Sequence, residues 1–213
     1  CNVCRRCAQL CPVGVDNALI AREIRKLFSQ EMGIAPRELY EKGTRQHLKA
    51  GSSTGMSPAG FHEAIEFIED EIGERTGKSI KIPIDKKGAD ILLIHNAGEY
   101  LSWPENPGAF AVLFDAAGIN YTLSSEPVGY DGVNYGAFCD DIELARIGLQ
   151  HVMIAKTLGV KKIVVGECGH AHKVLCVITD RVFPGDLSIS EIPRESCFPL
   201  FWEIVKSGAV KLD

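Results

Sequence analysis

Apolar residues in the first third of the chain recur at helical spacing. One stripe, with residues three and four positions apart, predicts a helix from about residue 16 to 33; its members are Ile20, Ile24, Leu27 and Phe28. Pro36 stands where a first-turn proline belongs and predicts a second helix to about residue 48. Ser57 and Pro58 predict the start of a third, whose buried face consists of Phe61, Ile65, Ile68 and Ile72. Residues 1–77 are therefore predicted to be a helical segment.

The pattern changes beyond residue 80, where short apolar runs alternate with longer amphipathic stretches. The runs at 89–95, 119–123, 160–166 and 187–192 predict strands. The stretches at 109–117, 143–158, 169–182 and 198–206 predict helices. Strands that alternate with helices are typical of βαβ units and a parallel sheet. We therefore expect an α+β chain: a helical segment followed by an α/β domain, residues 78–213, whose parallel sheet is flanked by helices.

Three unusual segments follow predicted strands directly. They are residues 95–100, 125–131 and 166–172. In a parallel sheet the carboxyl ends of the strands and the loops after them form the usual ligand-binding edge. We therefore expect the three segments to converge in space.

Charge and composition exclude several classes of function. The formal net charge is −5 and Lys and Arg are spread thinly, so a nucleic-acid partner is not expected. No apolar stretch reaches the length of a membrane span. Eight cysteines without a signal peptide indicate a reducing compartment, and we expect a cytoplasmic protein.

The strongest chemical signal is a cysteine run at the start of the chain. Cys1, Cys4, Cys7 and Cys11-Pro12 form a C-x2-C-x2-C-x3-C-P pattern, which is typical of [4Fe–4S] ferredoxins. Three sulfurs at this spacing can wrap around one cube, and the fourth serves another cube in two-cluster proteins. Structural zinc would need a separate second pair of cysteines, and a disulfide across this spacing would be strained. We therefore predict that Cys1, Cys4 and Cys7 bind one cluster and Cys11 a second.

The two predicted clusters need more sulfurs than this run supplies. One cube lacks a fourth ligand and the other lacks three, and one upstream run of the same pattern would provide all four. The chain also has no initiator Met. We expect an upstream segment that carries these ligands.

These features together resemble the D-type family of heterodisulfide reductase proteins, whose members join a two-cluster ferredoxin domain to two cysteine-rich CCG domains. The likeness is closest to the branch in membrane-associated redox complexes of sulfate reducers, such as the K subunit of the complex linked to dissimilatory sulfite reductase. Residues 1–77 are similar to the second half of the ferredoxin domain, and residues 88–213 to the first CCG domain. The last residues, 197–213, look like a connector to a second CCG domain, so the resemblance implies a chain cut at both ends.

The CCG-like domain departs from the family pattern at its ligand positions. The first family cysteine falls near Ala97, the Cys-Cys-Gly falls on Pro127-Val128-Gly129, and the Cys-x-x-Cys falls on Cys168 to Ala171. One thiolate cannot hold the family's noncubane cluster. Cys168, with His170 close by at a predicted helix start, is either a reactive or vestigial site or a packed leftover. We interpret Cys139, Cys176 and Cys197 as core residues and His95, His170 and His172 as polar rim residues rather than metal ligands.

Three functions are compatible with these features. The first is an electron-transfer iron–sulfur subunit whose clusters pass electrons toward a disulfide- or thiol-reducing site elsewhere. The resemblance implies other subunits of a redox complex as partners, a membrane quinol-oxidising subunit among them, and attachment to the inner membrane through them. The second is the iron–sulfur subunit of a flavin-dependent glycolate, lactate or glycerol-3-phosphate dehydrogenase. The third is a non-catalytic CCG-like scaffold. In each case, this stretch is expected to lack the catalytic site.

Overall fold

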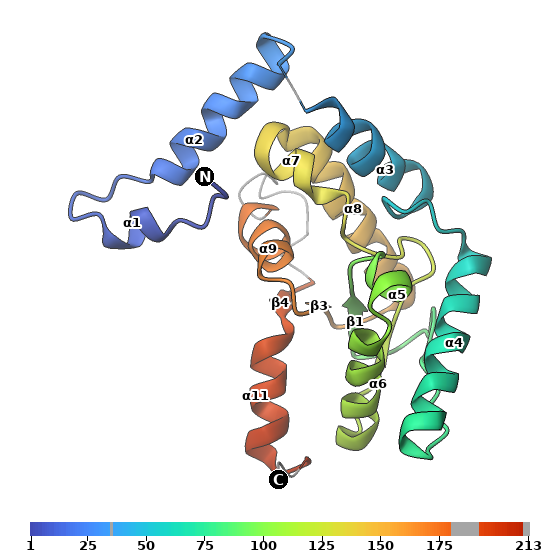
Figure 1. Cartoon of the computed structure of the whole chain (residues 1–213). Helices are drawn as coiled ribbons and strands as arrows, with labels where there is room; N and C mark the ends of the chain where they lie inside the picture. Colours follow the sequence, from blue (N-terminus) through green and yellow to red (C-terminus); the bar gives the residue numbers. More distant parts are fainter. Residues whose placement is uncertain (35, 180–191, 211–213) are drawn as a thin grey trace.

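A computed structural model describes residues 1–34, 36–179 and 192–210. The first part of the chain is helical, and two of its elements, named η, are wider π-helical turns. These elements are α1 (Arg6–Leu10), α2 (Asn17–Lys26), η1 (Leu27–Glu31), η2 (Leu39–Arg45), α3 (Gln46–Ala50) and α4 (Pro58–Thr76). Figure 1 shows α1 and α2 as an arm that extends from the body of the molecule.

The second part alternates strands and helices. Its elements are β1 (Ile91–Ile94), α5 (Glu99–Ser102), α6 (Glu105–Ala117), β2 (Tyr121–Thr122), α7 (Val133–Cys139), α8 (Asp141–Leu158), β3 (Lys162–Val165), α9 (Gly169–His172), η3 (Lys173–Ile178), β4 (Arg194–Ser196) and α11 (Cys197–Ser207). The described strands form a parallel sheet of order β2-β1-β3-β4. Leu92 of β1 pairs with Ile163 of β3, and Ile163 lies opposite Arg194 of β4. The predicted parallel sheet flanked by helices is confirmed.

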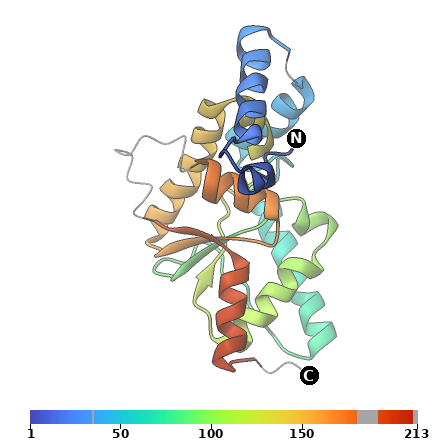
Figure 2. The same cartoon turned by 90° about the vertical axis from the view of Figure 1, so that its left-hand side faces the viewer.

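The sheet separates two apolar cores, because β1 and β3 are buried on both faces. On one face Leu92 and Ile163 pack with α7, α8, α9 and η3. On the other face Leu93 and Val164 pack with α4, α6 and α11. Figure 2 shows the sheet nearly edge-on between these two layers. Parallel strands covered in this way read as continuous apolar runs, which explains why the sequence marked them clearly.

Helix starts follow the capping residues of the sequence. Asp16 accepts hydrogen bonds from the backbone N–H groups of Ala18 and Leu19 at the start of α2. Ser57 accepts one from Gly60 before α4, with Pro58 at the first position. Asp140 does the same for α8. Each cap satisfies N–H groups that the helix itself leaves unpaired.

Some expected boundaries differ from the structure. The strand predicted at 119–123 is reduced to Tyr121–Thr122. The strand predicted at 187–192 lies almost wholly outside the described residues, and β4 starts later, at Arg194. The helices α5 and α7 were not predicted. Both are short and lie within segments that the sequence marks by turn residues, so periodicity could not reveal them.

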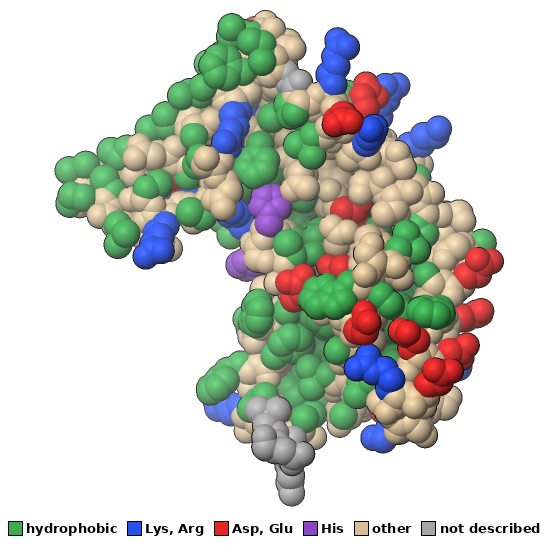
Figure 3. Space-filling view, viewed as in Figure 1, with side chains coloured by type: hydrophobic (Ala, Val, Ile, Leu, Met, Phe, Trp, Pro, Cys, Tyr) green, Lys and Arg blue, Asp and Glu red, His purple; other side chains and the backbone are tan. Residues whose placement is uncertain are grey.

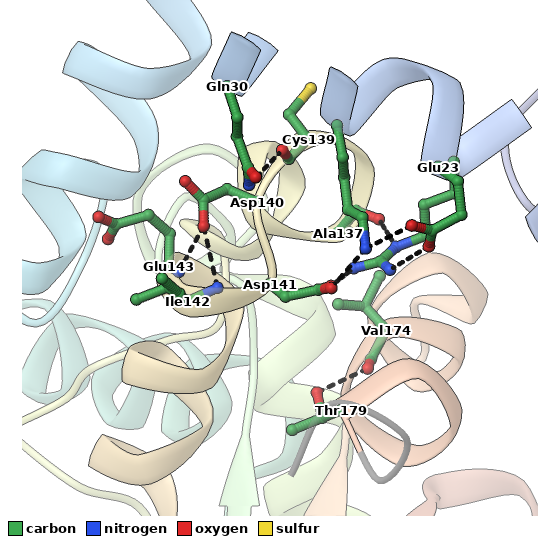
Figure 4. A network of polar contacts seen from close by, with 12 residues as sticks. Glu23, Gln30, Ala137, Cys139, Asp140, Asp141, Ile142, Glu143, Val174 and Thr179 are labelled. Atoms are coloured by element: carbon green, nitrogen blue, oxygen red, sulfur yellow. Dashed lines mark hydrogen bonds and ion pairs between the residues drawn. The ribbon is translucent and has the colours of Figure 1, made fainter. Parts of the chain in front are cut away.

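The helical segment is tied to the α/β body by a charged network (Figure 4). The buried Arg22 of α2 donates from Nε to the carbonyl oxygen of Ala137 at 2.8 Å and pairs through Nη2 with Asp141. Lys26 Nζ lies 2.7 Å from the other oxygen of Asp141. Burial raises the pKa of Asp141, but the hydrogen bonds from Arg22 and Lys26 outweigh it, and the net pKa is lowered. Asp141 therefore works as an anion that holds α2 against the start of α8.

A second tie joins α3 to the loop after β2 through two buried histidines. His47 of α3 and His151 of α8 are almost fully buried, with ring centroids 6.0 Å apart. His151 Nε2 lies 3.0 Å from the carbonyl oxygen of Gly129, and Thr44 Oγ1 donates to the carbonyl oxygen of Gly132 at 2.5 Å. A Cβ on Gly132 would stand 2.3 Å from Cβ of His47, so only glycine permits this approach.

Within the described residues, no helix combines the length and the hydrophobicity that a bilayer span requires.

Candidate functional site

The cysteine run forms a loop that is docked on the α/β body. Val3, between Cys1 and Cys4, is fully buried in the same apolar core as Ala171 and Val174. Lys173 Nζ donates to the carbonyl oxygen of Asn2 at 2.6 Å. The loop therefore faces the amino end of the α9–η3 helix, although the two segments are far apart in the sequence.

The four sulfurs of the run are accessible and unbridged. Cys1, Cys4 and Cys7 are exposed, Cys11 is partly exposed, and all four are free thiols. Across the part of the chain that the structure describes, no three Cys, His, Asp or Glu side chains stand close enough together to hold one metal ion. The loop thus offers four accessible sulfur donors, whereas a single metal ion finds no ready set of three ligands among the described residues.

The environment of Cys11 favours its thiolate form. Backbone N–H groups of Val13 and Val15 point at the sulfur and lower the pKa of the Cys11 thiol, and Val15 N lies 3.3 Å from Sγ. Iron–sulfur clusters require thiolate ligands, and N–H···S hydrogen bonds are a normal part of their surroundings. The turn after Pro12 therefore suits a ligand.

Arg25 of α2 lies beside Cys1. Its Nη2 donates to the carbonyl oxygen of Cys1 at 2.5 Å, and its guanidinium carbon lies 5.2 Å from the centre of the Phe138 ring. Its other terminal nitrogen, Nη1, is buried and finds no hydrogen-bond acceptor among the described residues. Burying a charged N–H donor without an acceptor costs free energy. The Arg25 guanidinium is therefore suited to an anionic group held by Cys1.

The three segments at the carboxyl edge of the sheet converge as expected. His95 and Gly129 form a parallel bridge, and the backbone N–H of Gly166 donates to the carbonyl oxygen of Ile94 at 2.9 Å. The Asp131 carboxylate accepts a hydrogen bond from Ala97 N at 3.0 Å and another from Ser53 N at 2.6 Å. The loop after β2 is thus bound to both the first segment and the helical part.

Close backbone packing occupies the positions where the resemblance would place cysteines. Ala97 is fully buried and Val128 nearly so. A Cβ on Gly129 would stand 2.6 Å from Ala97 N and 2.9 Å from the carbonyl oxygen of His95. Gly51 O accepts hydrogen bonds from the N–H groups of Val128 and Gly129. The edge is therefore packed by backbone at these positions.

Cys168 remains partly exposed in the short loop between β3 and α9. Burial first, and then the nearby Glu99 and Cys168, raise the pKa of Tyr130, whose hydroxyl is hydrogen-bonded to the Cys168 side chain. Tyr130 Oη also lies 3.4 Å from Glu99 Oε1. His170 does not face Cys168 as a paired base; its ring stacks on Phe138 with centroids 5.4 Å apart.

The other predicted roles of cysteine and histidine hold in part. Cys139 and Cys197 are buried, whereas Cys176 is partly exposed.

The expectation that His95 is a polar rim residue is wrong, because its side chain is 1% exposed. Its Nδ1 lies 3.2 Å from Glu99 Oε2. Burial raises the pKa of Glu99, but the His95 hydrogen bond outweighs it and the net pKa is lowered. His170 and His172 are partly exposed, as rim residues would be.

The arm carries an exposed apolar surface. Figure 3 shows hydrophobic side chains along its outer side. The predicted stripe of α2 and η1 lies on this surface rather than in a core, with side chains between 45% and 57% exposed. The surface consists of Leu10, Val13, Val15, Ile20, Ile24, Leu27, Phe28, Met32 and Ile34. Continuous exposed patches of this kind mark interaction sites in soluble proteins.

The chain is similar in sequence to two curated archaeal proteins. It is 30% identical over 174 residues to the Hdr-like menaquinol oxidoreductase iron–sulfur subunit 2 of Archaeoglobus fulgidus. It is 28% identical over 174 residues to the Hdr-like menaquinol oxidoreductase iron–sulfur subunit of Archaeoglobus profundus. Both matches cover 80% of this chain and 31% of the relative.

These relatives support an Hdr-like iron–sulfur protein. The chain spans about a third of the length of the curated relatives it matches. No family model and no solved structure matches it.

Sequence reasoning missed the residues that hold the cysteine loop. Arg25 and Lys173 act through contacts with distant parts of the chain, and their neighbours in the sequence give no sign of them. Val3 gave a weak indication that the cysteine loop is docked, because an apolar residue inside a metal-binding run needs a surface to pack against.

Proposed function

We propose that this chain is an electron-transfer part of an iron–sulfur subunit in an Hdr-like redox complex. The observation that carries the proposal is the C-x2-C-x2-C-x3-C-P run, held as four free thiols in one loop against the α/β body. The names of the two archaeal relatives support an iron–sulfur role. The first cubane takes Cys1, Cys4 and Cys7 as ligands and the second takes Cys11, with the remaining sulfurs supplied from outside residues 1–213.

A bound [4Fe–4S] cluster supplies one-electron transfer, and the chain's own residues fix where this happens. Val3 and Lys173 hold the cysteine loop against the body, and Arg25 holds its first carbonyl group. The turn at Cys11 favours the ionised form of that sulfur. The α/β domain acts as a rigid support, and the disulfide- or thiol-reducing site belongs to another part of the complex.

The partner proposal depends on the exposed arm. Its apolar surface flanks the cysteine run and suits another part of the complex that brings the missing ligands. The relatives' names mention a menaquinol oxidoreductase, which supports a quinol-oxidising partner as the electron donor. A membrane subunit in that role and a cytoplasmic location are further parts of the proposal.

The variant Cys4→Ala tests the metal assignment. Removing one of three ligands should release one cubane, so the purified protein should lose about four irons and one low-temperature EPR signal of the reduced state. Cys176→Ala is the matched control, because this partly exposed cysteine lies outside the run and should keep both. Full iron content and an unchanged EPR spectrum in Cys4→Ala would contradict the assignment.

A further inference from the structure

The surroundings of Cys1 are built from elements that lie far from it in the sequence. A cavity of about 500 Å³ is lined by Cys1, Asn2, Arg25, Phe138 and Cys139, among others. The charged side chain on its wall is Arg25, and the rest of the lining is mostly apolar. A positive charge next to apolar walls acts over a longer range than one in bulk water.

The Arg25 guanidinium is fixed on two sides and free on a third. Nη2 donates to the carbonyl oxygen of Cys1, and the guanidinium packs over the Phe138 ring. Phe138 is itself fixed by stacking on His170. Nη1 is buried and has no hydrogen-bond acceptor among the described residues. A donor held so firmly, with its hydrogens unused, is preorganised for an anionic acceptor beside Cys1.

We propose that Arg25 is a positioning residue that sets the reduction potential of the cluster bound by Cys1, by placing a fixed positive charge and an N–H donor beside it. This inference rests on the proposed function. Reduction adds one electron to the cluster and makes it more negative, with no proton transferred to the chain. A nearby cation stabilises the reduced form more than the oxidised form, and hydrogen bonds to cluster sulfurs act in the same direction.

Two alternative roles for Arg25 lead to different results. If Arg25 only anchors the loop, its replacement lowers iron content or stability and leaves the potential of any retained cluster unchanged. If general surface charge sets the potential, any arginine of the helical segment has the same effect. Arg45 is the matched control, because it also lies in the helical segment, is 67% exposed and pairs with Glu41.

The test compares wild type, Arg25→Gln, Arg25→Lys and Arg45→Gln in the complete protein or complex that also supplies the remaining ligands, loaded with iron and sulfide. Iron content and EPR of the reduced state are measured first, followed by mediator titration of the midpoint potential. Arg25→Gln should keep its iron and shift the midpoint downward, so that the ratio of reduced to oxidised cluster at a fixed potential falls about tenfold, or about 59 mV for one electron. Arg25→Lys keeps the charge and should recover part of the shift, and Arg45→Gln should match wild type.

Several outcomes would overturn the proposal. A midpoint in Arg25→Gln equal to that of wild type, or an equal shift in Arg45→Gln, excludes specific tuning by Arg25. Loss of the cluster in both Arg25→Gln and Arg25→Lys assigns the residue to anchoring instead. If wild type itself binds no cubane, the proposed function fails rather than this inference.

Discussion

Cys168 lies where a reactive thiol could work, yet its neighbours argue for a structural position. Tyr130 is hydrogen-bonded to it, and burial keeps that tyrosine neutral by raising its pKa. Glu99, the next group along, is already paired with His95. Within the described residues, Cys168 belongs to no group of three side chains that could hold a metal ion. The surrounding acid–base groups are thus occupied with one another.

The variant Cys168→Ser should therefore leave the clusters unchanged. The serine hydroxyl can still pair with Tyr130, and we expect a change of no more than about 1 kcal/mol in unfolding free energy. Iron content, reduced-state EPR and the rate of dye-linked electron transfer should match wild type, while Cys7→Ser in the run should alter all three. Loss of activity in Cys168→Ser alone would reveal a working site at the sheet edge.

At the scale of the element, α2 combines two opposed faces. One face holds the buried Arg22 and Lys26 against Asp141, and the other exposes Ile20 and Ile24 to solvent. The sequence predicted this helix from its apolar stripe, but that stripe lies outside. Periodicity identifies a helix and its apolar face, and it cannot say whether the face meets this chain's own core or another surface.

The variant Asp141→Asn tests the tie between α2 and α8. The substitution removes the partner of Arg22 Nη2 and leaves this side chain, 5% exposed, with the more distant carboxylate of Glu23, whose Oε1 lies 3.6 Å from Nη1. Asp141 is itself about a third exposed, so water reduces the loss. We expect a destabilisation of about 1 to 3 kcal/mol, measured as a lower urea midpoint at a constant slope. Glu38→Gln, which breaks the exposed pair with Lys42, should leave the midpoint unchanged. Equal stability of Asp141→Asn and wild type would contradict the role of this network.

At the scale of the whole molecule, two buried histidines make the junction of the helical and α/β parts sensitive to acid. Burial, and then the neighbouring His47, lower the pKa of His151 to about 4, and burial lowers that of His47. Both rings are therefore neutral when folded at pH 7. An unfolded histidine titrates near 6.5. Above pH 6.5 the histidines are neutral in both the folded and the unfolded chain, and the folded state keeps its full stability. As the pH falls toward 4, the unfolded chain takes up protons that the folded chain does not, and the free energy of unfolding decreases.

The variant His151→Gln should be less sensitive to acid than wild type. Glutamine can still donate to the carbonyl oxygen of Gly129 and does not titrate. For wild type the difference between pH 7 and pH 4 should include up to about 3 kcal/mol from His151, measured by urea unfolding at several pH values. The exposed His62 provides the control His62→Gln, which should follow wild type. Parallel pH profiles for His151→Gln and wild type would contradict this account.

The sequence predicted the architecture better than the contacts that hold the site. Strands β1 and β3 were marked by continuous apolar runs, and helices α4 and α8 by long periodic patterns and clear caps. The histidine junction was not, because His47 and His151 lie far apart in the sequence and are brought together only in the folded chain, beside Gly129 and Gly132. The docking of the cysteine loop depends equally on distant partners. Local pattern determines elements, whereas these sites arise from tertiary packing.

The burial of Val3 sets the order of events during synthesis. A ribosome makes the cysteine loop first and the helix that receives it about 170 residues later, since Lys173 holds the carbonyl group of Asn2. Until Ala171 and Val174 are in place, Val3 has no apolar pocket to enter. Until then the cysteine loop has no partner on the body and stays undocked. The docked form of the cysteine loop is therefore a late product of folding, available only after the segment that carries Ala171 and Val174 has joined the apolar core.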